Sequence, residues 1–289
     1  METNISNNRT WLITGTSGGF GSELVRAALK RGDSVVATSR NPRKVASDFE
    51  GLSDRLLAMP MDLRDSAQIA AVVDAAIGRF GRIDVLVNNA GHGLIGAVEE
   101  TDDAEIASVF ETNVFGLLRV TRAVLPHMRA RRSGQIVNLS SVSGLVGLAG
   151  FGIYNATKFA VEGLSEALAK EVAPLGIRVM LVEPGPFRTD FLGGSLALAA
   201  HVLPDYGPTA GQMRAGAVTR NGAQPGDPVR GADAIVRALA ADQPPLHLIL
   251  GEGAFKLAMQ KFDALRNEME RWRETSFSTE FRQTQPTPM

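Results

Sequence analysis

Short apolar runs alternate with longer segments of helical periodicity along most of the chain. Runs such as 10–14, 85–87 and 179–182 are continuously apolar, as expected of parallel strands that are covered on both faces. Between the runs, apolar residues recur every three to four positions, which is typical of amphipathic helices. The alternation predicts an α/β fold with a single doubly wound, Rossmann-type parallel sheet and helices on both faces. The expected strands are 10–14, 34–38, 56–59, 83–87, 135–139, 178–182 and 247–250, and the expected helices are 22–30, 67–80, 104–131, 151–173 and 231–241.

Two segments depart from this alternation. Residues 186–228 are rich in Gly, Pro and Ala and form a connection much longer than an ordinary one, so we expect a substrate loop or lid. Residues 252–289 form a C-terminal helix and tail, in which apolar positions from Phe255 to Trp272 follow a helical stripe. The pattern favours a helix packed on the body, although a lid or an oligomer contact remains open. We therefore expect one dinucleotide-binding catalytic domain over residues 1–289.

Composition narrows the function classes. The 289 residues are 44% hydrophobic, enough to bury a large core, and the formal net charge of −1 gives no electrostatic case for binding nucleic acid or an anionic membrane. The absence of cysteine excludes disulfides and thiolate chemistry. The four histidines show no metal-ligand spacing, so no metal is expected. The first ten residues are polar, without an apolar targeting segment, and a cytoplasmic location is the default.

An uncharged stretch at 133–157 is long enough to span a bilayer. It also contains five glycines, Gln135 and two asparagines, which a lipid-facing helix would not carry. The better interpretation is a buried strand at 135–139, a glycine-rich active-site loop, and a helix that begins near Phe151. The sequence therefore predicts no transmembrane segment.

A glycine-rich turn follows the first strand. Gly15, Gly19 and Gly21 lie between the strand at 10–14 and an amphipathic helix, a layout that directs helix N-terminal amides at a phosphate. The spacing is G-x-x-x-G-x-G and does not match the common dinucleotide fingerprint G-x-G-x-x-G. Although an ordinary tight βα turn would also contain glycine, three spaced glycines at the first turn of an α/β chain favour a phosphate site.

Tyr154 and Lys158 stand four positions apart, so on a helix they share one face. A fixed positive charge favours the phenolate and would lower the tyrosine pKa from its usual value near ~10. A hydroxyl from Ser141 could then hold a substrate oxygen against the phenol. Alone, a Tyr-x-x-x-Lys spacing is a weak signal.

Together, these motifs resemble the short-chain dehydrogenase/reductase family. Residues 14–21 match its TGxxxGxG turn, residues 88–91 match its NNAG motif, and the matches span about residues 10–250 in the family's order. The resemblance implies a catalytic tetrad of Asn113, Ser141, Tyr154 and Lys158, with Asn113 holding a water that links Lys158 to solvent. It also implies a cofactor site made of Gly15, Thr16, Ser17, Gly19, Phe20, Gly21, Asn89, Ala90, Gly91, Tyr154, Lys158, Pro184, Gly185 and Thr189, with Asp62 and Leu63 at the adenine.

The end of the second strand favours NADP(H) over NAD(H). An acidic residue at this place accepts a hydrogen bond from the ribose 2′-hydroxyl of NAD, whereas an arginine accommodates the 2′-phosphate of NADP. Here Ser39 and Arg40 end the strand, and no acidic residue stands at its tip. Arg40 offers a planar fork of donors that suits a phosphate, although a solvated turn residue is the ordinary alternative.

The combined expectation is an oxidoreductase that transfers a hydride between NADP(H) and a lipophilic secondary alcohol or ketone. The resemblance is greatest to the hydroxysteroid and retinol dehydrogenase type. Two alternatives remain: an NADP(H)-sensing regulatory protein without turnover, and a sugar-nucleotide epimerase or dehydratase. The expected partner is a small molecule, neither nucleic acid nor membrane, and the oligomeric state is open. The expected pocket residues are His92, Leu94, Val142, Leu145, Phe151, Phe187 and Phe191, none of them able to hold a carboxylate or phosphate as an arginine or lysine would.

Overall fold

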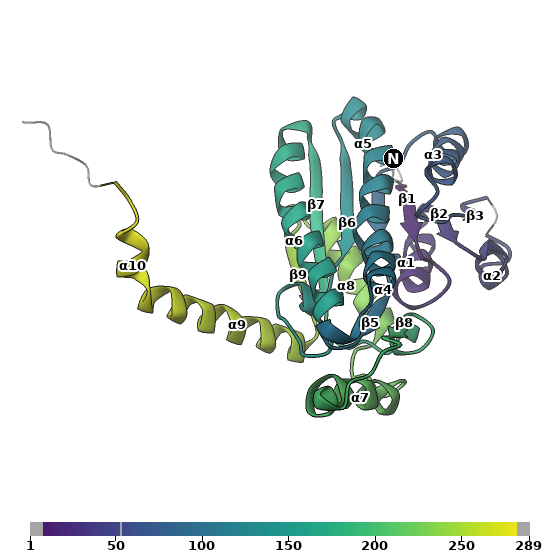
Figure 1. Cartoon of the computed structure of the whole chain (residues 1–289). Coiled ribbons are helices and arrows are strands. Elements are labelled where there is room, and N and C mark those ends of the chain that lie inside the picture. Colours follow the sequence, from purple (N-terminus) through teal and green to yellow (C-terminus); the bar gives the residue numbers. More distant parts are fainter. Residues whose placement is uncertain (1–7, 53, 282–289) are drawn as a thin grey trace, which may run out of the picture.

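A seven-stranded parallel sheet is the centre of the structure, a computed structural model that describes residues 8–52 and 54–281 (Figure 1). Its strands run in the order β3-β2-β1-β4-β6-β7-β9. The order reverses next to β1, which pairs with β2 on one side and β4 on the other, and ligands of such sheets bind outside the carboxyl ends of the strands at this point. The predicted fold class is confirmed. The strands are β1 (Thr10–Thr14), β2 (Ser34–Ser39), β3 (Leu56–Pro60), β4 (Val85–Asn88), β6 (Gly134–Leu139), β7 (Ile177–Pro184) and β9 (His247–Leu250).

Two apolar layers cover the sheet because alternate strand residues face opposite sides. In β1, Trp11 and Ile13 join one buried cluster and Leu12 joins the other. The first cluster packs against α1 (Gly19–Lys30) and α8 (Pro228–Ala240), and the short α2 (Pro42–Asp48) adds Val45 to it. The second packs against α3 (Ser66–Phe80), α5 (Leu117–Arg131) and α6 (Gly152–Val172).

Acidic N-caps set the start of two helices. Asp65 accepts hydrogen bonds from the backbone N–H groups of Ala67 and Gln68, so α3 begins within one residue of its predicted start. Asp227 caps α8 in the same way, and Pro228 occupies the first helical position, where a missing N–H costs nothing. The prediction placed the start of α8 three residues too late because it followed apolar periodicity and overlooked the Asp-Pro signal.

The long helix predicted over 104–131 is interrupted in the structure. The helix α4 (Asp103–Phe110) and α5 are joined by a π-helical turn at Glu111–Gly116. Gly116 lies so close to Leu63 that an added Cβ would stand 2.7 Å from the Leu63 Cβ. The turn buries Asn113, and single π turns inside helices often mark functional sites.

The segment 186–228 carries local structure that the sequence did not reveal. It contains 3-10 turns at Asp190–Leu192 and Pro204–Tyr206, the strand β8 (Leu196–Leu198), a π turn at Gly207–Gly211 and the helix α7 (Gln212–Arg220). β8 pairs in parallel with β5 (Gly93–Ile95), outside the main sheet. This pairing ties the segment to the chain that follows β4.

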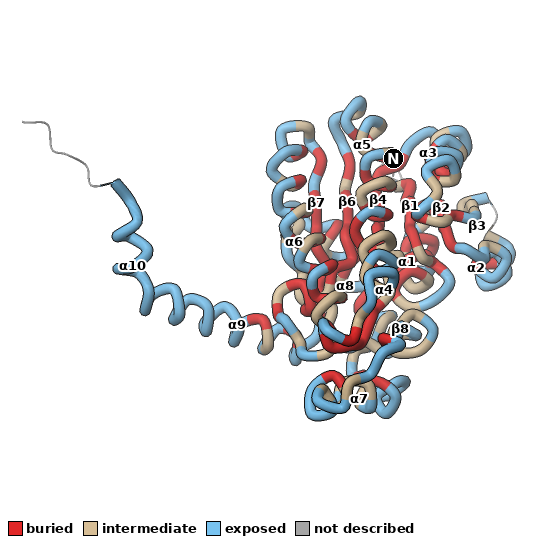
Figure 2. The backbone as a smooth tube through the Cα atoms, in the orientation of Figure 1, coloured by how far each residue is buried: buried red, intermediate tan, exposed pale blue. Residues whose placement is uncertain are grey.

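The C-terminal helices project from the body. α9 (Glu252–Arg271) and α10 (Arg273–Phe277) extend beyond the sheet in Figure 1, and Figure 2 shows this arm exposed along most of its length. Only Ala254 and Ala258 of α9 are buried. The expectation of a helix packed on the body is therefore wrong after Ala258, because no other described segment covers the apolar stripe. Within residues 8–52 and 54–281, no helix combines the length and apolarity that a membrane span requires.

Candidate active site

A cavity of about 1030 Å³ opens at the carboxyl ends of the strands. Its walls come from the turn after β1, the tip of β2, the loops after β4 and β6, the start of α6, the end of β7 and the segment 186–228. The fold therefore gathers into one space the motifs that lie far apart in sequence.

The turn after β1 depends on glycine for its close contacts. Gly15 and Gly19 adopt positive φ of 70° and 57°, a conformation that other residues rarely adopt. A Cβ on Gly15 would stand 2.8 Å from the Ala90 Cα, and one on Gly21 would stand 2.2 Å from the Gly15 carbonyl oxygen. Asn89 fixes the turn by donating from Nδ2 to the carbonyls of Thr14 and Gly15, at 2.9 and 2.8 Å.

Three basic residues line the cavity near the tip of β2. Arg40 was expected there, whereas Lys44 and Arg64 were missed by the sequence analysis. The backbone N–H and the guanidinium of Arg64 donate to the Asp62 carboxylate, and the shortest of these hydrogen bonds joins Nη2 to Oδ2 at 2.6 Å. They lower the Asp62 pKa to about 2, with a smaller contribution from the charge of Arg40. Lys44 follows the end of β2 and Arg64 follows the end of β3. A basic residue shortly after a strand end was the signal in the sequence that could have identified them.

The Ser39 hydroxyl at the same place is buried and has no hydrogen-bond partner among the described residues. An unpaired buried hydroxyl directly before Arg40 in the cavity lining fits an oxygen-rich anionic group. The glycine turn likewise leaves room for a close backbone approach, and Gly18 at the start of α1 provides no capping side chain for the helix amides. These features fit a bound dinucleotide.

Tyr154 lines the cavity at the start of α6. Its ring packs between Phe151 and Phe191, with ring centroids at 5.7 and 5.5 Å. Burial raises the Tyr154 pKa well above its usual value, and a hydrogen bond with Ser141 opposes that shift in part. The phenol is therefore a protonated donor at neutral pH in this environment.

Lys158 is buried one helical turn further along α6. Its Nζ donates to the Leu139 carbonyl at 2.7 Å and lies 5.7 Å from the centroid of the Tyr154 ring. Burial lowers the Lys158 pKa to about 8, while the nearby charge of Glu162 acts in the opposite direction. The expected lowering of the tyrosine pKa by Lys158 does not prevail here, because burial of the phenol dominates.

Ser141 and Asn113 complete the predicted tetrad. The Ser141 hydroxyl accepts from the backbone N–H of Ser143 at 3.1 Å and stands 3.5 Å from the Pro184 carbonyl. Asn113 donates from Nδ2 to the His92 carbonyl and to the Thr157 hydroxyl, at 2.9 and 3.1 Å, and its Oδ1 accepts from the His92 N–H. The amide of Asn113 thus joins the loop after β4 to α6, one residue before Lys158.

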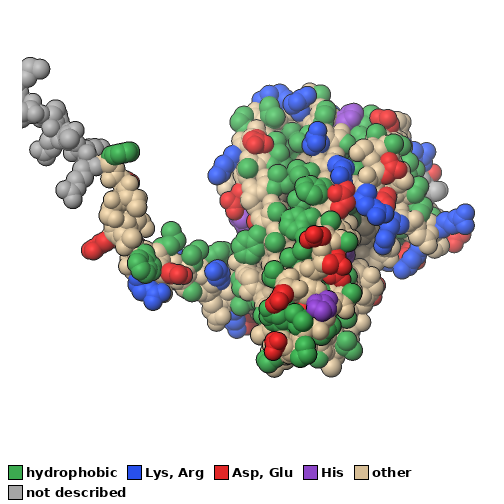
Figure 3. All heavy atoms as spheres, in the orientation of Figure 1, with side chains coloured by type: hydrophobic (Ala, Val, Ile, Leu, Met, Phe, Trp, Pro, Cys, Tyr) green, Lys and Arg blue, Asp and Glu red, His purple; other side chains and the backbone are tan. Residues whose placement is uncertain are grey.

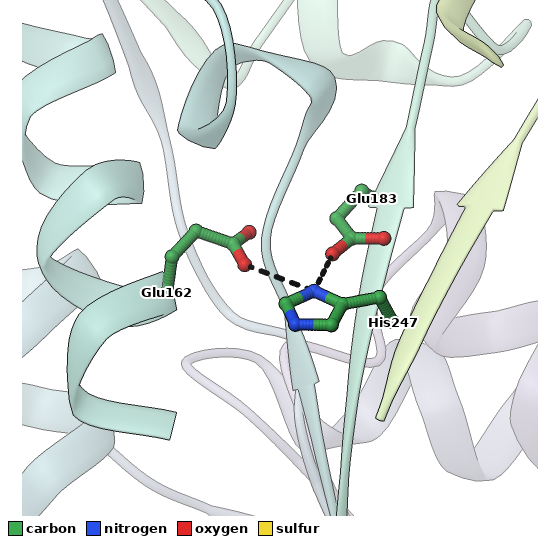
Figure 4. A group of neighbouring side chains, drawn as sticks. All are labelled: Glu162, Glu183 and His247. Atoms are coloured by element: carbon green, nitrogen blue, oxygen red, sulfur yellow. Dashed lines mark hydrogen bonds and ion pairs between the residues drawn. The ribbon is translucent and has the colours of Figure 1, made fainter. Parts of the chain in front are cut away.

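A cluster of two carboxyl groups and an imidazole lies behind this site (Figure 4). His247 Nδ1 contacts Glu183 Oε1 at 2.7 Å and Glu162 Oε2 at 3.7 Å, and the Ser140 hydroxyl donates to Glu162. Burial is the largest cause that raises the pKa of both glutamates to about 7. Spacing could not reveal this group because its members come from α6, β7 and β9.

The predicted pocket residues divide into two sets. His92, Val142, Phe151, Phe187 and Phe191 line the cavity, whereas Leu94 and Leu145 are absent from its lining. Leu94 is buried in β5, and Leu145 packs into a separate apolar cluster with Val146 and Ala254.

The apolar end of the cavity also has members that the sequence analysis missed. Met213, Ala217, Leu148, Leu192 and Leu196 join Phe151, Tyr154 and Phe191 in one apolar cluster, and each of them lines the cavity. Arg220 lines the cavity too, so the expectation of a pocket without arginine is wrong. Its Nε donates to the Gly216 carbonyl at 2.8 Å within α7.

The predicted cofactor residues lie together at the other end. Gly15, Ser17, Gly19, Phe20, Ser39, Arg40, Asp62, Leu63, Asn89, Ala90, Gly91, Pro184, Gly185 and Thr189 line the cavity. Thr16 and Gly21 support the turn from behind: the hydroxyl of Thr16 donates to the Thr38 carbonyl, and Gly21 packs on Gly15.

The family model for short chain dehydrogenases matches residues 9–197, well over half of the chain. The chain belongs to the short-chain dehydrogenase family. The predicted resemblance is thereby confirmed, and the protein is a dehydrogenase/reductase enzyme. This result does not support the regulatory and epimerase alternatives.

Three proteins of known sequence are similar to this chain. Oxidoreductase BOA17 of Botryotinia fuckeliana is 35% identical over 272 residues, covering 94% of this chain and 99% of that protein. The 3-ketodihydrosphingosine reductase of Bacteroides thetaiotaomicron is 43% identical over 180 residues, covering 62% and 64%. Retinol dehydrogenase 8 of Homo sapiens is 43% identical over 196 residues, covering 65% and 62%.

Solved structures share the fold closely. A short-chain dehydrogenase from Streptomyces avermitilis superposes with a TM-score of 0.89 at 43% identity, covering 95% of this chain and all of that one. A Burkholderia phymatum family member in complex with NAD has a TM-score of 0.76 at 24% identity, with 98% of each chain covered. Serine dehydrogenase complexed with NADP⁺ has a TM-score of 0.72 at 26% identity, covering 83% and 94%. Neighbours of this fold therefore bind either dinucleotide.

Proposed function

We propose that the protein is an NADP(H)-dependent oxidoreductase of lipophilic secondary alcohols and ketones. The observation that carries the proposal is the place of Tyr154, whose ring stands between a polar end of the cavity and an apolar one. A phenol at this boundary would face both a bound dinucleotide and an apolar carbonyl compound.

The polar end supports a 2′-phosphorylated dinucleotide. The glycine turn would hold the diphosphate, Ser39 and Arg40 would hold the 2′-phosphate, and Lys158 would bind the nicotinamide ribose. Pro184, Gly185 and Thr189 would contact the nicotinamide end. When bound, NADP(H) supplies or accepts the hydride.

The protein's own residues supply the proton and the orientation. In reduction, the Tyr154 hydroxyl donates its proton to the oxygen of the former carbonyl group, and in oxidation the phenolate takes the alcohol proton. Ser141, which is hydrogen-bonded to the phenol, would orient the substrate oxygen. The Lys158 ammonium would stabilise the phenolate that remains after donation, and it would supply this charge below its pKa of about 8.

The apolar side chains next to Tyr154 support a substrate without a charged group beside its reacting carbon. Arg220, which also lines the cavity, donates instead to the Gly216 carbonyl within α7. Phe151, Phe191 and Met213 belong to the cluster around Tyr154. Two of the relatives are named for the lipophilic compounds retinol and 3-ketodihydrosphingosine. Their names agree with this choice of substrate class.

A paired substrate screen tests the proposal. Medium-chain methyl ketones and keto acids of equal length are each offered with NADPH and with NADH, and turnover is followed at the nicotinamide absorbance. We expect the ketones with NADPH to give the highest kcat/KM. Turnover of the keto acids alone would contradict the proposed substrate class, and a preference for NADH would contradict the proposed cofactor.

A further inference from the structure

The apolar side chains of α9 form a continuous exposed stripe beyond the body. Figure 3 shows hydrophobic side chains along this arm. At the centre of the stripe, Phe262 and Leu265 are each 42% exposed, values that are high for such large apolar groups. Their spacing of three and four positions keeps them on one face of the helix. The stripe consists of Phe255, Met259, Phe262, Leu265, Met269 and Trp272.

The stripe follows the seven-residue repeat of a helix that packs against another helix. Phe255, Phe262 and Met269 are seven apart, and Ala258 and Leu265 begin a second series, three positions after the first. Trp272, the residue that caps the C-terminus of α9, continues this second series. These are the a and d positions of a coiled coil. Of these positions, the body of the same chain buries only Ala258. The pattern calls for a helical partner that the described part of the chain does not provide.

The charges of α9 argue against a lipid surface as that partner. A helix that lies on an anionic membrane usually has a strongly basic polar face. Basic and acidic residues are equal in number in α9, so this attraction is missing. They are Lys256, Lys261, Arg266 and Arg271 against Glu252, Asp263, Glu268 and Glu270.

We propose that α9 pairs in an antiparallel manner with α9 of a second copy of this chain. In the register that the repeat sets, Phe262 faces the partner's Leu265, and Phe255 faces the partner's Trp272. The two-fold symmetry of such a pair makes each contact twice. The seam would cover Phe255, Phe262, Leu265, Met269 and Trp272, which are all exposed in the single chain.

Charge complementarity selects the antiparallel arrangement. Lys261 and Glu268 occupy the same flanking position of the repeat, one residue before Phe262 and Met269. In the antiparallel register, Lys261 faces the partner's Glu268, again twice. In a parallel pair, Lys261 would instead face the partner's Arg266, a repulsive contact. Neither Lys261 nor Glu268 forms an ion pair within the described chain, so both are available for this contact.

The first test disrupts the seam and measures the mass of the full-length protein in solution by light scattering across a dilution series. Leu265→Glu should raise the dimer dissociation constant at least about a hundredfold, because it places two carboxylates in the apolar seam. The control Gln260→Glu adds the same charge to the opposite face of α9 and should leave the dimer intact. Circular dichroism confirms that both variants keep their helix content.

A monomeric wild type would overturn the proposal. So would a dimer that survives Leu265→Glu, since the contact would then lie on another face. Binding of the wild type to neutral lipid vesicles in place of self-association would also overturn it.

The second test exchanges the flanking charges. Lys261→Glu and Glu268→Lys should each weaken the dimer roughly tenfold, because each turns two attractive pairs into repulsive ones. A mixture of the two variants should form mixed dimers, and the double variant Lys261→Glu/Glu268→Lys should recover the wild-type affinity. A parallel pair predicts the opposite sign for Lys261→Glu, which would then tighten the dimer. That result, or a double variant that stays as weak as the single ones, would overturn the antiparallel arrangement.

Discussion

The two ends of the cavity are built in different ways. The polar end comes mainly from short stretches that directly follow parallel strands, with Gly15 after β1 and Ser39 at the tip of β2. The apolar end takes Phe151 from the chain before α6, and Phe191 and Met213 from the segment 186–228. The first end follows from sheet topology, whereas the second depends on how distant segments pack. A single cavity thus combines a site dictated by local sequence with one that only the tertiary structure defines.

Tyr154 separates the two ends, and its removal gives the largest expected effect. Tyr154→Phe keeps the ring and its packing against Phe151 and Phe191 but removes the proton donor. General acid–base groups contribute ~10²–10⁴-fold, so kcat should fall by about that factor while the Kd of NADPH stays unchanged. Stopped-flow turnover and fluorescence titration of NADPH measure the two quantities. Activity within a few-fold of wild type would show that Tyr154 is not the proton donor.

The glycine turn at the polar end could be predicted from the sequence, because strand, turn and helix are local features. Lys44 and Arg64, which line the same end, were missed. The apolar end was predicted only in part. Phe151 and Phe191 were found, but Leu94 is buried in β5 and Leu145 packs in another apolar cluster. Met213 lies on a helix inside a segment that looked irregular. Packing between distant segments decides which apolar side chain reaches a cavity, and a single sequence does not encode that choice in its periodicity.

The direction in which α9 leaves the body could not be predicted from the sequence either. Its helical pattern was correctly identified, yet an apolar stripe does not specify whether its partner is the same chain or another one. The cluster of Glu162, Glu183 and His247 is a similar case, because parallel strands and a helix bring together residues up to 85 positions apart in number (247 minus 162).

At the polar end, Arg40→Ala should weaken the binding of the cofactor and leave the binding of the substrate unchanged. A charge-assisted hydrogen bond contributes roughly 1.5–3 kcal/mol, so its loss should weaken NADPH binding by about one to two orders of magnitude. NADH lacks the 2′-phosphate and should bind as before. Adding Ser39→Asp should reduce NADPH binding further, since the carboxylate repels phosphate and accepts from a free 2′-hydroxyl. Equal losses for both dinucleotides would show that Arg40 does not read the 2′-phosphate.

At the apolar end, Phe191→Ala should weaken the binding of the substrate and leave the binding of the cofactor unchanged. The ring lies 5.5 Å from that of Tyr154, and losing its contact surface should raise KM for a lipophilic ketone about tenfold. The Kd of NADPH should not change. A variant that loses NADPH affinity while keeping KM for the ketone would contradict the division of the cavity.

Behind both ends, the buried carboxyl pair should make stability depend on pH. The folded-state pKa of Glu162 and of Glu183 is raised to about 7, mainly by burial, so the folded protein binds more protons than the unfolded chain. The stability that this proton binding contributes is fully present below the unfolded value near ~4.3 and is lost as the pH rises through about 7.

The variant Glu183→Gln should therefore flatten the fall of the melting temperature between about pH 5 and pH 7. Thermal unfolding across this range measures the slope of the melting temperature against pH. The exposed Glu166→Gln, whose carboxyl lies 3.9 Å from His247, provides a matched control and should retain the wild-type slope. Identical slopes for Glu183→Gln and wild type would exclude the pair as the source.

A homologous series of methyl ketones tests the central claim most directly, namely that the cavity joins an NADP(H) site to an apolar substrate site at Tyr154. With NADPH as the reductant, each added methylene should gain about 0.8 kcal/mol of burial, so kcat/KM should rise roughly fourfold per carbon until the apolar end is filled. The same series in Phe191→Ala should rise less steeply. A flat series in the wild type, or one that rises equally with NADH, would contradict the account.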